Sequence, residues 1–183
     1  KYQRNGKPGR WFDADAAIWV LNQTADPDAA RLEFLLATLF NLCIGNTDNH
    51  AKNHALLYSE GRTPVFAPLY DLLPIRIDDR YNHQLSFNIG DASFFDNMTS
   101  GDLATFIVQC GVEDISEFVD KLAGPMLEQL EAATPILRSQ NQKKFDDLIG
   151  REMGRLSELL NATIDFRERD TFLTKGGGWG TVS

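Results

Sequence analysis

The chain has 183 residues, of which 43% are hydrophobic, and its formal net charge is −8. This length and hydrophobic content are typical of one globular domain and exclude a disordered chain. An acidic chain repels phosphate backbones, so we expect no direct nucleic-acid binding. No apolar run approaches the ~20 residues that cross a bilayer, and no signal peptide is visible, so we expect no membrane insertion and a cytoplasmic location.

The first part of the chain is predicted to be a loop followed by two helices. Residues 1–10 are glycine-rich and basic, which favours a loop. Residues 11–23 can form a short helix with Asp13 near its start. A longer helix follows, because Asp26 is a suitable N-cap, the next residue is proline, and Gly45 can end the helix. Apolar side chains recur along it at helical spacing, at Leu32, Leu35, Leu36, Leu39, Phe40 and Cys43.

The rest of the chain is predicted to contain one β-hairpin and further helices. The apolar runs ALLYS and PVFAPLYD flank the turn EGRT, which indicates a hairpin. From Ser100 onward the pattern is helical, with an interruption or kink at Gly124–Pro125 and a last long helix over roughly 142–163. Residues 174–183 are expected to form a flexible tail. We therefore predict one mainly α domain over residues 1–183, with a small β-hairpin.

The two cysteines, Cys43 and Cys110, lie in apolar contexts and are predicted to be reduced core thiols.

A polar cluster, GNTDNHAKN, interrupts the apolar pattern between the long helix and the hairpin. Asp48 and Asn53 are five positions apart within it. Counting from Asn53 to the turn near Gly61 and back by the same number of residues reaches 69–70, directly before Asp71. Antiparallel strands bring such residues side by side, so Asp48, Asn53 and Asp71 are predicted to converge although Asp71 follows Asn53 by eighteen positions.

Two carboxylates and one amide oxygen are hard ligands, which suit Mg²⁺ and suit zinc poorly. Phosphoryl transfer uses a metal to neutralise phosphate charge and a separate carboxylate to accept the proton of the attacking hydroxyl. The kinase pattern is Asp, four residues, Asn, a hairpin and a second Asp, which makes Asp48 the candidate base and makes Asn53 and Asp71 the candidate metal ligands. The alternative is structural, because Asn-Thr-Asp-Asn is also favourable turn chemistry.

The stretch IGNTDNHAKNHALLY, followed by FAPLYDLLP, resembles the C-terminal region of HipA-type toxins, which are serine/threonine protein kinases. The opening KY…NGKPG resembles the start of that region, so specific motifs run from Lys1 to about Pro74. The resemblance implies the mainly helical C-lobe of a kinase-like fold, with Asp48 as catalytic base. It also implies that Asn53 and Asp71 hold Mg²⁺ against ATP.

Two further residues of the motif are candidates for the site. Lys52 is the second candidate catalytic residue, because its charge can stabilise the transferring phosphoryl group, although it can equally pair with the base or face solvent. His50 is counted with the two metal ligands among the candidates for binding the Mg-ATP cofactor, and bracing the loop is its alternative role. His54 and His83 carry no specific signal.

The family acts in toxin–antitoxin systems, so the resemblance implies two partners. Members phosphorylate a protein of the translation machinery, typically an aminoacyl-tRNA synthetase, which arrests growth and favours persistence. A DNA-binding antitoxin restrains the kinase. The implied partners of this chain are therefore an antitoxin and a protein substrate.

The chain departs from a complete kinase upstream of the loop, and this keeps two rival functions open. The 47 residues before Asp48 contain neither the Gly-rich loop nor the strand lysine of an N-lobe, so we expect the isolated chain to bind Mg-ATP weakly. That departure favours the first rival, a non-catalytic module that docks an antitoxin or another subunit. The second rival is a small-molecule phosphotransferase. Such enzymes usually carry His two positions before the Asp, where this chain has Asn46.

Overall fold

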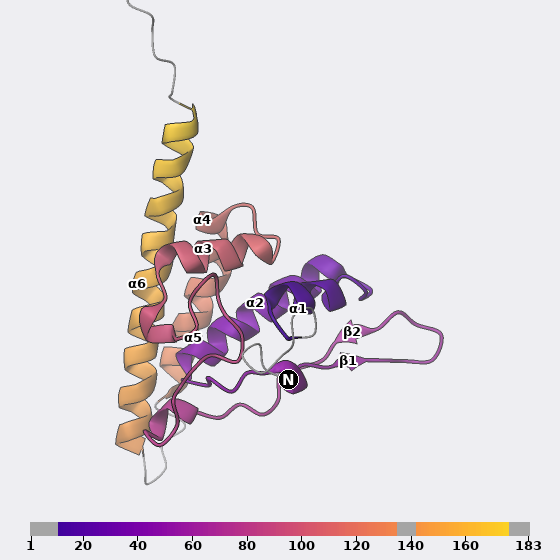
Figure 1. Cartoon of the computed structure of the whole chain (residues 1–183), viewed down its shortest axis with the longest axis horizontal. Coiled ribbons are helices and arrows are strands. Elements are labelled where there is room, and N and C mark those ends of the chain that lie inside the picture. Colours follow the sequence, from indigo (N-terminus) through magenta and orange to yellow (C-terminus); the bar gives the residue numbers. More distant parts are fainter. Residues whose placement is uncertain (1–10, 135–141, 176–183) are drawn as a thin grey trace, which may run out of the picture.

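The computed structural model describes residues 11–134 and 142–175, and over these ranges the chain is mainly helical with one two-stranded hairpin. The helices and strands are α1 (Ala14–Leu21), α2 (Pro27–Cys43), β1 (Leu56–Leu57), β2 (Val65–Phe66), α3 (Ser100–Gln109), α4 (Ile115–Phe118), α5 (Gly124–Ala133) and α6 (Gln142–Lys175). Short 3₁₀ turns span Ala51–Asn53, Ile75–Ile77 and Phe95–Asn97, and a π-helical turn spans Val119–Ala123. Helix α6 runs along one side of the molecule, and the hairpin projects from the other (Figure 1). The predicted fold class is confirmed.

The first two helices begin at the predicted caps. The Asp13 carboxylate accepts a hydrogen bond from the Ala16 N–H at 2.8 Å, and the Asp26 carboxylate accepts one from the Ala29 N–H at 3.1 Å. Each satisfies an N–H that the helix itself leaves unpaired. Gly45 has φ +70° just after α2, which is the left-handed conformation that ends many helices. The end of α2, and with it the start of the polar cluster, therefore follows from a local signal, Gly45.

Helix α2 lies at the centre of the core. Its buried residues include more positions than the apolar stripe that the sequence predicts. It contacts α1, α6 and β2. Of the predicted stripe, Leu35, Leu39 and Cys43 are fully buried, whereas Leu32 and Leu36 are only partly buried. Other faces of α2 are buried as well, at Ala30, Phe34, Ala37, Thr38, Asn41 and Leu42. The polar cluster thus follows directly after a helix that is buried on several faces.

The two cysteines behave as predicted from their apolar contexts. Cys43 and Cys110 are free thiols, and both are buried. Burial disfavours the thiolate and raises the pKa of each thiol to about 12. Neither thiol is therefore a nucleophile near neutral pH.

The predicted interruption before Pro125 takes the form of the π-helical turn. The Gly124 N–H donates to the Val119 carbonyl, five residues back, where an α-helix would reach four. The wider turn accommodates the proline ring, which would crowd the carbonyl four residues before it. The interruption at Gly124–Pro125 is confirmed.

Helix α6 is longer than its apolar pattern predicts. It continues to Lys175, so residues 174 and 175 of the expected tail belong to the helix. Residues 176–183, together with the predicted loop at 1–10, lie outside the described residues. Among the described helices, none combines the length and the apolar character that crossing a bilayer requires.

Candidate functional site

The hairpin has the register that the residue count predicted. Strands β1 and β2 are antiparallel, with Leu56 opposite Phe66. The Ala67 N–H donates to the Ala55 carbonyl at 3.0 Å, which carries the same register one step further from the turn. The turn is centred on Gly61, whose φ of +69° is readily available only to glycine. The same register, continued away from the turn, places residues 69 and 70 opposite residues 53 and 52.

Beyond the paired strands, the two arms remain in contact. The Tyr70 hydroxyl donates to the Lys52 carbonyl at 2.6 Å. The Asn46 Nδ2 donates to the Asp71 carbonyl at 3.3 Å. These bonds join residues 18 and 25 positions apart in sequence. These two hydrogen bonds show that the chain at Asp71 returns to the loop, as predicted.

The loop holds Asn53 by both its backbone and its side chain. The Asn53 N–H donates to the His50 carbonyl at 2.8 Å, and the Asn53 Nδ2 donates to the Asp48 carbonyl at 3.2 Å. The Asp48 carbonyl also accepts from the His50 N–H at 2.8 Å. Because the amide nitrogen of Asn53 is directed into the loop, its Oδ1 is the atom that can serve a cation.

Asn46 connects the loop to the core helix, and the sequence analysis missed this role. Its Nδ2 donates to the Asn41 Oδ1 at 2.7 Å, and its Oδ1 accepts from the Asp48 N–H at 3.2 Å. On the other side of the loop, the Ser86 hydroxyl donates to the Thr47 carbonyl at 2.9 Å. A signal for Asn41 existed, since it is a polar residue among the apolar positions of α2. Ser86 gave no such signal, because it lies 39 positions away.

The candidate residues differ in their exposure. His50 and Asn53 are buried, with exposed fractions of 5% and 4%, whereas Asp48 is half-buried. Lys52 and Asp71 are exposed. His50 and Asn53 therefore form the buried, hydrogen-bonded part of the site, whereas the Asp71 carboxylate and the Lys52 ammonium group face solvent.

Asp71 adopts a backbone conformation that non-glycine residues seldom use. Its φ is +59°, in the left-handed region, which Asp and Asn tolerate better than other side chains. Such strain persists only where surrounding contacts hold the residue, and it is concentrated at functional sites. Here the Asn46 amide holds the Asp71 carbonyl.

The donor set fits Mg²⁺ better than a metal that needs a complete protein cage. Among residues 11–134 and 142–175, no three His, Cys, Asp or Glu side chains are grouped so that they could hold a metal. Asn53 Oδ1 and the Asp71 carboxylate offer two oxygen ligands. Mg²⁺ is commonly bound through one or two carboxylates, together with waters and substrate phosphates.

An apolar cavity of about 360 Å³ borders the turn that carries Asn53. It lies between α1, α2 and the hairpin, and its aromatic and small lining residues include Trp11, Phe12, Phe34, Ala51, His54 and Phe66. Cavities of this size and composition are typical of small-molecule sites.

His54 belongs to an aromatic cluster rather than to the candidate site. Its ring centroid lies 5.2 Å from that of Phe34, 5.9 Å from that of Phe12 and 6.1 Å from that of Phe66. Within the described part of the chain, neither ring nitrogen finds a hydrogen-bond partner. Burial, with a smaller contribution from His50, lowers the pKa of His54 to about 4. The ring is therefore neutral at neutral pH.

This burial predicts a pH-dependent stability that His54→Phe should remove. The pKa of His54 falls from 6.5 to about 4 on folding, so between these values the unfolded chain binds a proton that the folded chain does not. The free energy of unfolding should therefore decrease as pH falls from 6.5 to 4, by up to about 3 kcal/mol. Urea unfolding of both forms at several pH values measures this, and His54→Phe should be more stable at pH 5. Equal pH slopes in the two forms would contradict the assignment.

Comparisons with known proteins show which family this chain is similar to. A family model described as the HipA-like C-terminal domain matches residues 1–135. The serine/threonine-protein kinase toxin HipA of Shewanella oneidensis is 32% identical over 120 residues, which cover 61% of this chain and 27% of the relative. A second relative is the protein Y4mE of Sinorhizobium fredii, which is named as a kinase. It is 32% identical over 114 residues, which cover 59% of this chain and 27% of the relative.

A solved structure shares the fold over most of the chain. It is the complex of HipA, HipB and operator DNA from Shewanella oneidensis, and the TM-score is 0.69 at 21% sequence identity. The match covers 90% of this chain and 42% of that one. This chain thus spans less than half the length of the proteins it matches. On the match of the family model over residues 1–135, the chain belongs to the HipA-like C-terminal domain family.

Proposed function

We propose that this chain supplies the catalytic loop of a serine/threonine protein kinase of the HipA toxin type, which transfers the γ-phosphate of ATP to a protein hydroxyl. One observation carries the proposal. The hairpin returns Asp71 to the loop of Asp48 and Asn53, with hydrogen bonds from Tyr70 to Lys52 and from Asn46 to Asp71. This arrangement supports the proposal, because the residues that we propose as base and metal ligands lie on chain segments that hydrogen bonds join.

In the proposed reaction, Asp48 is the general base. The hydroxyl oxygen of the protein substrate attacks the γ-phosphorus, the bond from that phosphorus to the β,γ-bridging oxygen breaks, and ADP leaves. The hydroxyl proton passes to the Asp48 carboxylate. The main chain of Asp48 is fixed on both sides, because its N–H donates to Asn46 and its carbonyl accepts from Asn53. Such positioning supplies much of the rate in phosphoryl transfer.

The other candidate residues bind and orient the nucleotide. Asn53 and Asp71 would hold Mg²⁺, which when bound neutralises the charge on the β- and γ-phosphates. We assign Lys52 to stabilising the charge of the transferring phosphoryl group, since its side chain is exposed beside the loop. His50 is buried, and its main chain bonds to both Asp48 and Asn53, which supports bracing of the Mg-ATP site over direct contact with the nucleotide.

The apolar cavity beside the same turn supports nucleotide binding. Ala51 lies in its wall, two residues before the proposed metal ligand Asn53. A planar, largely apolar base suits the aromatic lining, while the phosphates reach the polar loop. We propose the adenine of ATP as the occupant.

The proposed partners are an antitoxin and a protein substrate. The structural neighbour from Shewanella oneidensis is a complex with HipB and operator DNA, which supports an antitoxin partner for this chain. The family resemblance supports a protein of the translation machinery, typically an aminoacyl-tRNA synthetase, as substrate, with growth arrest and persistence as the consequence. The rival small-molecule phosphotransferase is disfavoured by Asn46, whose side chain is committed to Asn41 and Asp71.

A phosphorylation assay with the full-length protein tests the proposal. The protein is incubated with γ-labelled ATP, Mg²⁺ and a bacterial lysate, and the labelled products are identified by mass spectrometry. We expect phosphoserine or phosphothreonine on another protein, and no such label when Mg²⁺ is chelated. The isolated 183-residue chain should transfer phosphate poorly in the same assay.

Two results would contradict the proposal. Label on a small molecule, with none on protein, would establish the rival phosphotransferase. Tight antitoxin binding without any phosphate transfer by the full-length protein would establish the docking module.

A further inference from the structure

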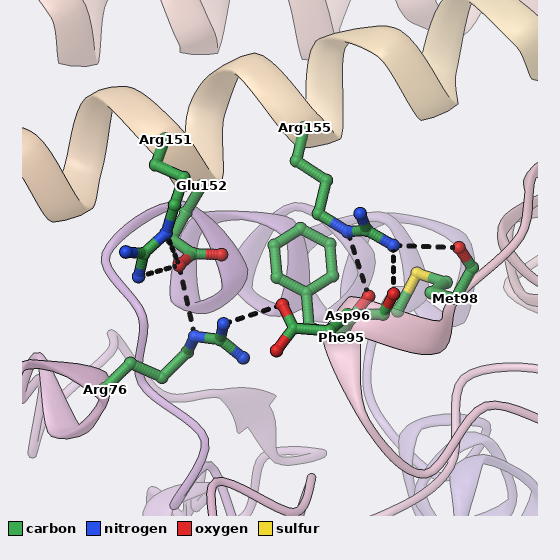
Figure 2. Close-up of polar contacts among 7 residues, drawn as sticks. All are labelled: Arg76, Phe95, Asp96, Met98, Arg151, Glu152 and Arg155. Atoms are coloured by element: carbon green, nitrogen blue, oxygen red, sulfur yellow. Dashed lines mark hydrogen bonds and ion pairs between the residues drawn. The ribbon is translucent and has the colours of Figure 1, made fainter. Parts of the chain in front are cut away.

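A buried ion pair joins the segment that follows Asp71 to the last helix. The Arg76 Nε donates to the Glu152 Oε1 at 3.1 Å, across 76 positions of sequence. The side chains are 8% and 1% exposed, respectively. Arg151, next to Glu152 on α6, donates to the same Oε1 from Nε at 3.0 Å and from Nη2 at 2.7 Å, and the Arg76 Nη2 reaches Asp96 at 2.7 Å (Figure 2).

Stability alone does not account for this pair. Removing two charges from water costs free energy that their attraction only partly offsets, and well-packed apolar residues often do as well or better. The pair is also incompletely satisfied, because the Arg76 Nη1 and the Glu152 Oε2 find no hydrogen-bond partner among the residues described. What the pair does provide is a fixed direction for Arg76, since a guanidinium holds its partners in a rigid planar fork.

The main chain of Arg76 reaches the start of the catalytic loop. Its N–H donates to the Gly45 carbonyl at 3.0 Å. A Cβ on Gly45 would lie 3.1 Å from the Arg76 Cβ and 3.1 Å from the Leu148 Cδ2, so a larger residue would push the segment away. Arg76 is thus held between Gly45, the first residue of the polar cluster, and helix α6.

The contacts of Arg76 with Gly45 and Glu152 hold the chain on the C-terminal side of Asp71. On the N-terminal side, Tyr70 bonds to Lys52, and the Asp71 carbonyl itself bonds to Asn46. Between Asp71 and the 3₁₀ turn at Ile75–Ile77, residues 72 and 73 are exposed leucines. A left-handed φ at a non-glycine residue persists only where the surrounding structure holds it, and the Arg76 contacts constrain the segment that follows Asp71.

We propose that Arg76 and Glu152 are positioning residues that hold Asp71 in the conformation that binds Mg²⁺ with ATP. The proposal rests on the function proposed above. Loss of the pair should leave the fold in place and weaken metal binding, as happens when residues that support metal ligands are changed.

The test compares Arg76→Met with Arg155→Met in the full-length protein. Arg155 is a matched control, because it lies one turn after Glu152 on α6 and its guanidinium bonds to the carbonyls of Phe95, Asp96 and Met98 rather than to Glu152 (Figure 2). Two readouts are taken. Calorimetry gives the Mg²⁺ concentration for half-saturation with a non-hydrolysable ATP analogue, and hydrogen exchange gives the protection of the backbone amides of residues 72–77.

Arg76→Met should raise the half-saturating Mg²⁺ concentration about 10- to 100-fold. It should also speed exchange at residues 72–77, whereas Arg155→Met should do neither. Glu152→Gln should shift both readouts in the same direction by less. The double variant Arg76→Met/Glu152→Met removes the charges together, so it should regain thermal stability while Mg²⁺ binding stays weak.

The outcomes separate this proposal from the proposed function. If the wild-type protein binds the analogue in an Mg²⁺-dependent manner and Arg76→Met behaves as Arg155→Met does, the positioning role is wrong and the kinase function stands. Recovery of Mg²⁺ binding in the double variant would also overturn it, since the pair would then be only structural. If the wild-type protein shows no Mg²⁺-dependent nucleotide binding, the proposed function fails and the positioning role fails with it.

Discussion

Asp48→Asn should lower the turnover number for protein phosphorylation by about 10²- to 10⁴-fold, the usual contribution of a positioned general base. The amide cannot accept the hydroxyl proton as a carboxylate does. The fold should be retained, because the hydrogen bonds of residue 48 with Asn46, His50 and Asn53 use its N–H and its carbonyl, both of which remain. Steady-state assays of the full-length protein at saturating Mg-ATP give the turnover number, and circular dichroism gives the melting temperature.

A matched variant separates loss of the base from loss of charge. Asp120→Asn makes the same chemical change at an exposed position in the π-helical turn, outside the candidate site, and should leave turnover unchanged. The Michaelis constant for ATP should change little in Asp48→Asn, since the proposed metal ligands are intact. Near-normal turnover in Asp48→Asn would show that another group accepts the proton.

The parts of this site that were predictable from the sequence are those set by short-range rules. The hairpin register follows from two apolar runs and one glycine turn, and the pairing of Leu56 with Phe66 confirms it. The start of α2 follows from Asp26, whose carboxylate caps the helix. A residue count across a turn could therefore place Asp71 beside the loop before any coordinates existed. The catalytic roles of these residues stay predictions.

The parts that were not predictable depend on contacts between distant segments. Glu152 is a carboxylate among the apolar positions of α6, and such a group is seldom fully buried unless it is paired; here it is fully buried, and Arg76 supplies a partner. Arg76 and Glu152 are 76 positions apart, and no sequence pattern predicts a pair over that separation. The left-handed φ of Asp71 is likewise held by contacts with distant residues, because Asn46 bonds to the Asp71 carbonyl and Lys52 accepts from the adjacent Tyr70.

The length of α6 shows the same limit. Its apolar stripe suggested an end near residue 163, whereas the helix continues to Lys175. An apolar stripe predicts where a helix has an amphipathic face, and it does not by itself predict where the helix ends. Half of residues 164–175 are charged, so the sequence there gives a weaker apolar pattern than the stretch before it.

Asp71→Asn should weaken the use of Mg-ATP more than it weakens the fold. Asparagine tolerates a left-handed φ as well as aspartate does, so the backbone at +59° and its bond to Asn46 should remain. What changes is the charge, because a neutral amide replaces an anionic ligand. Loss of a residue that merely supports a metal ligand costs up to about 100-fold, so loss of the ligand itself should lower kcat/KM for Mg-ATP at least that much.

Titration with the metal distinguishes a ligand from a residue that only shapes the site. In the presence of EDTA, wild-type protein and Asp71→Asn should bind ATP with the same weak affinity, because no metal bridges the carboxylate to the phosphates. As Mg²⁺ is added, the wild-type affinity should rise and that of Asp71→Asn should lag, with a higher half-saturating concentration. The thermal stabilities of the two proteins should agree within about 1 kcal/mol, as expected for an exposed side chain. Identical Mg²⁺ titrations would mean that Asp71 holds its strained backbone for some purpose other than the metal.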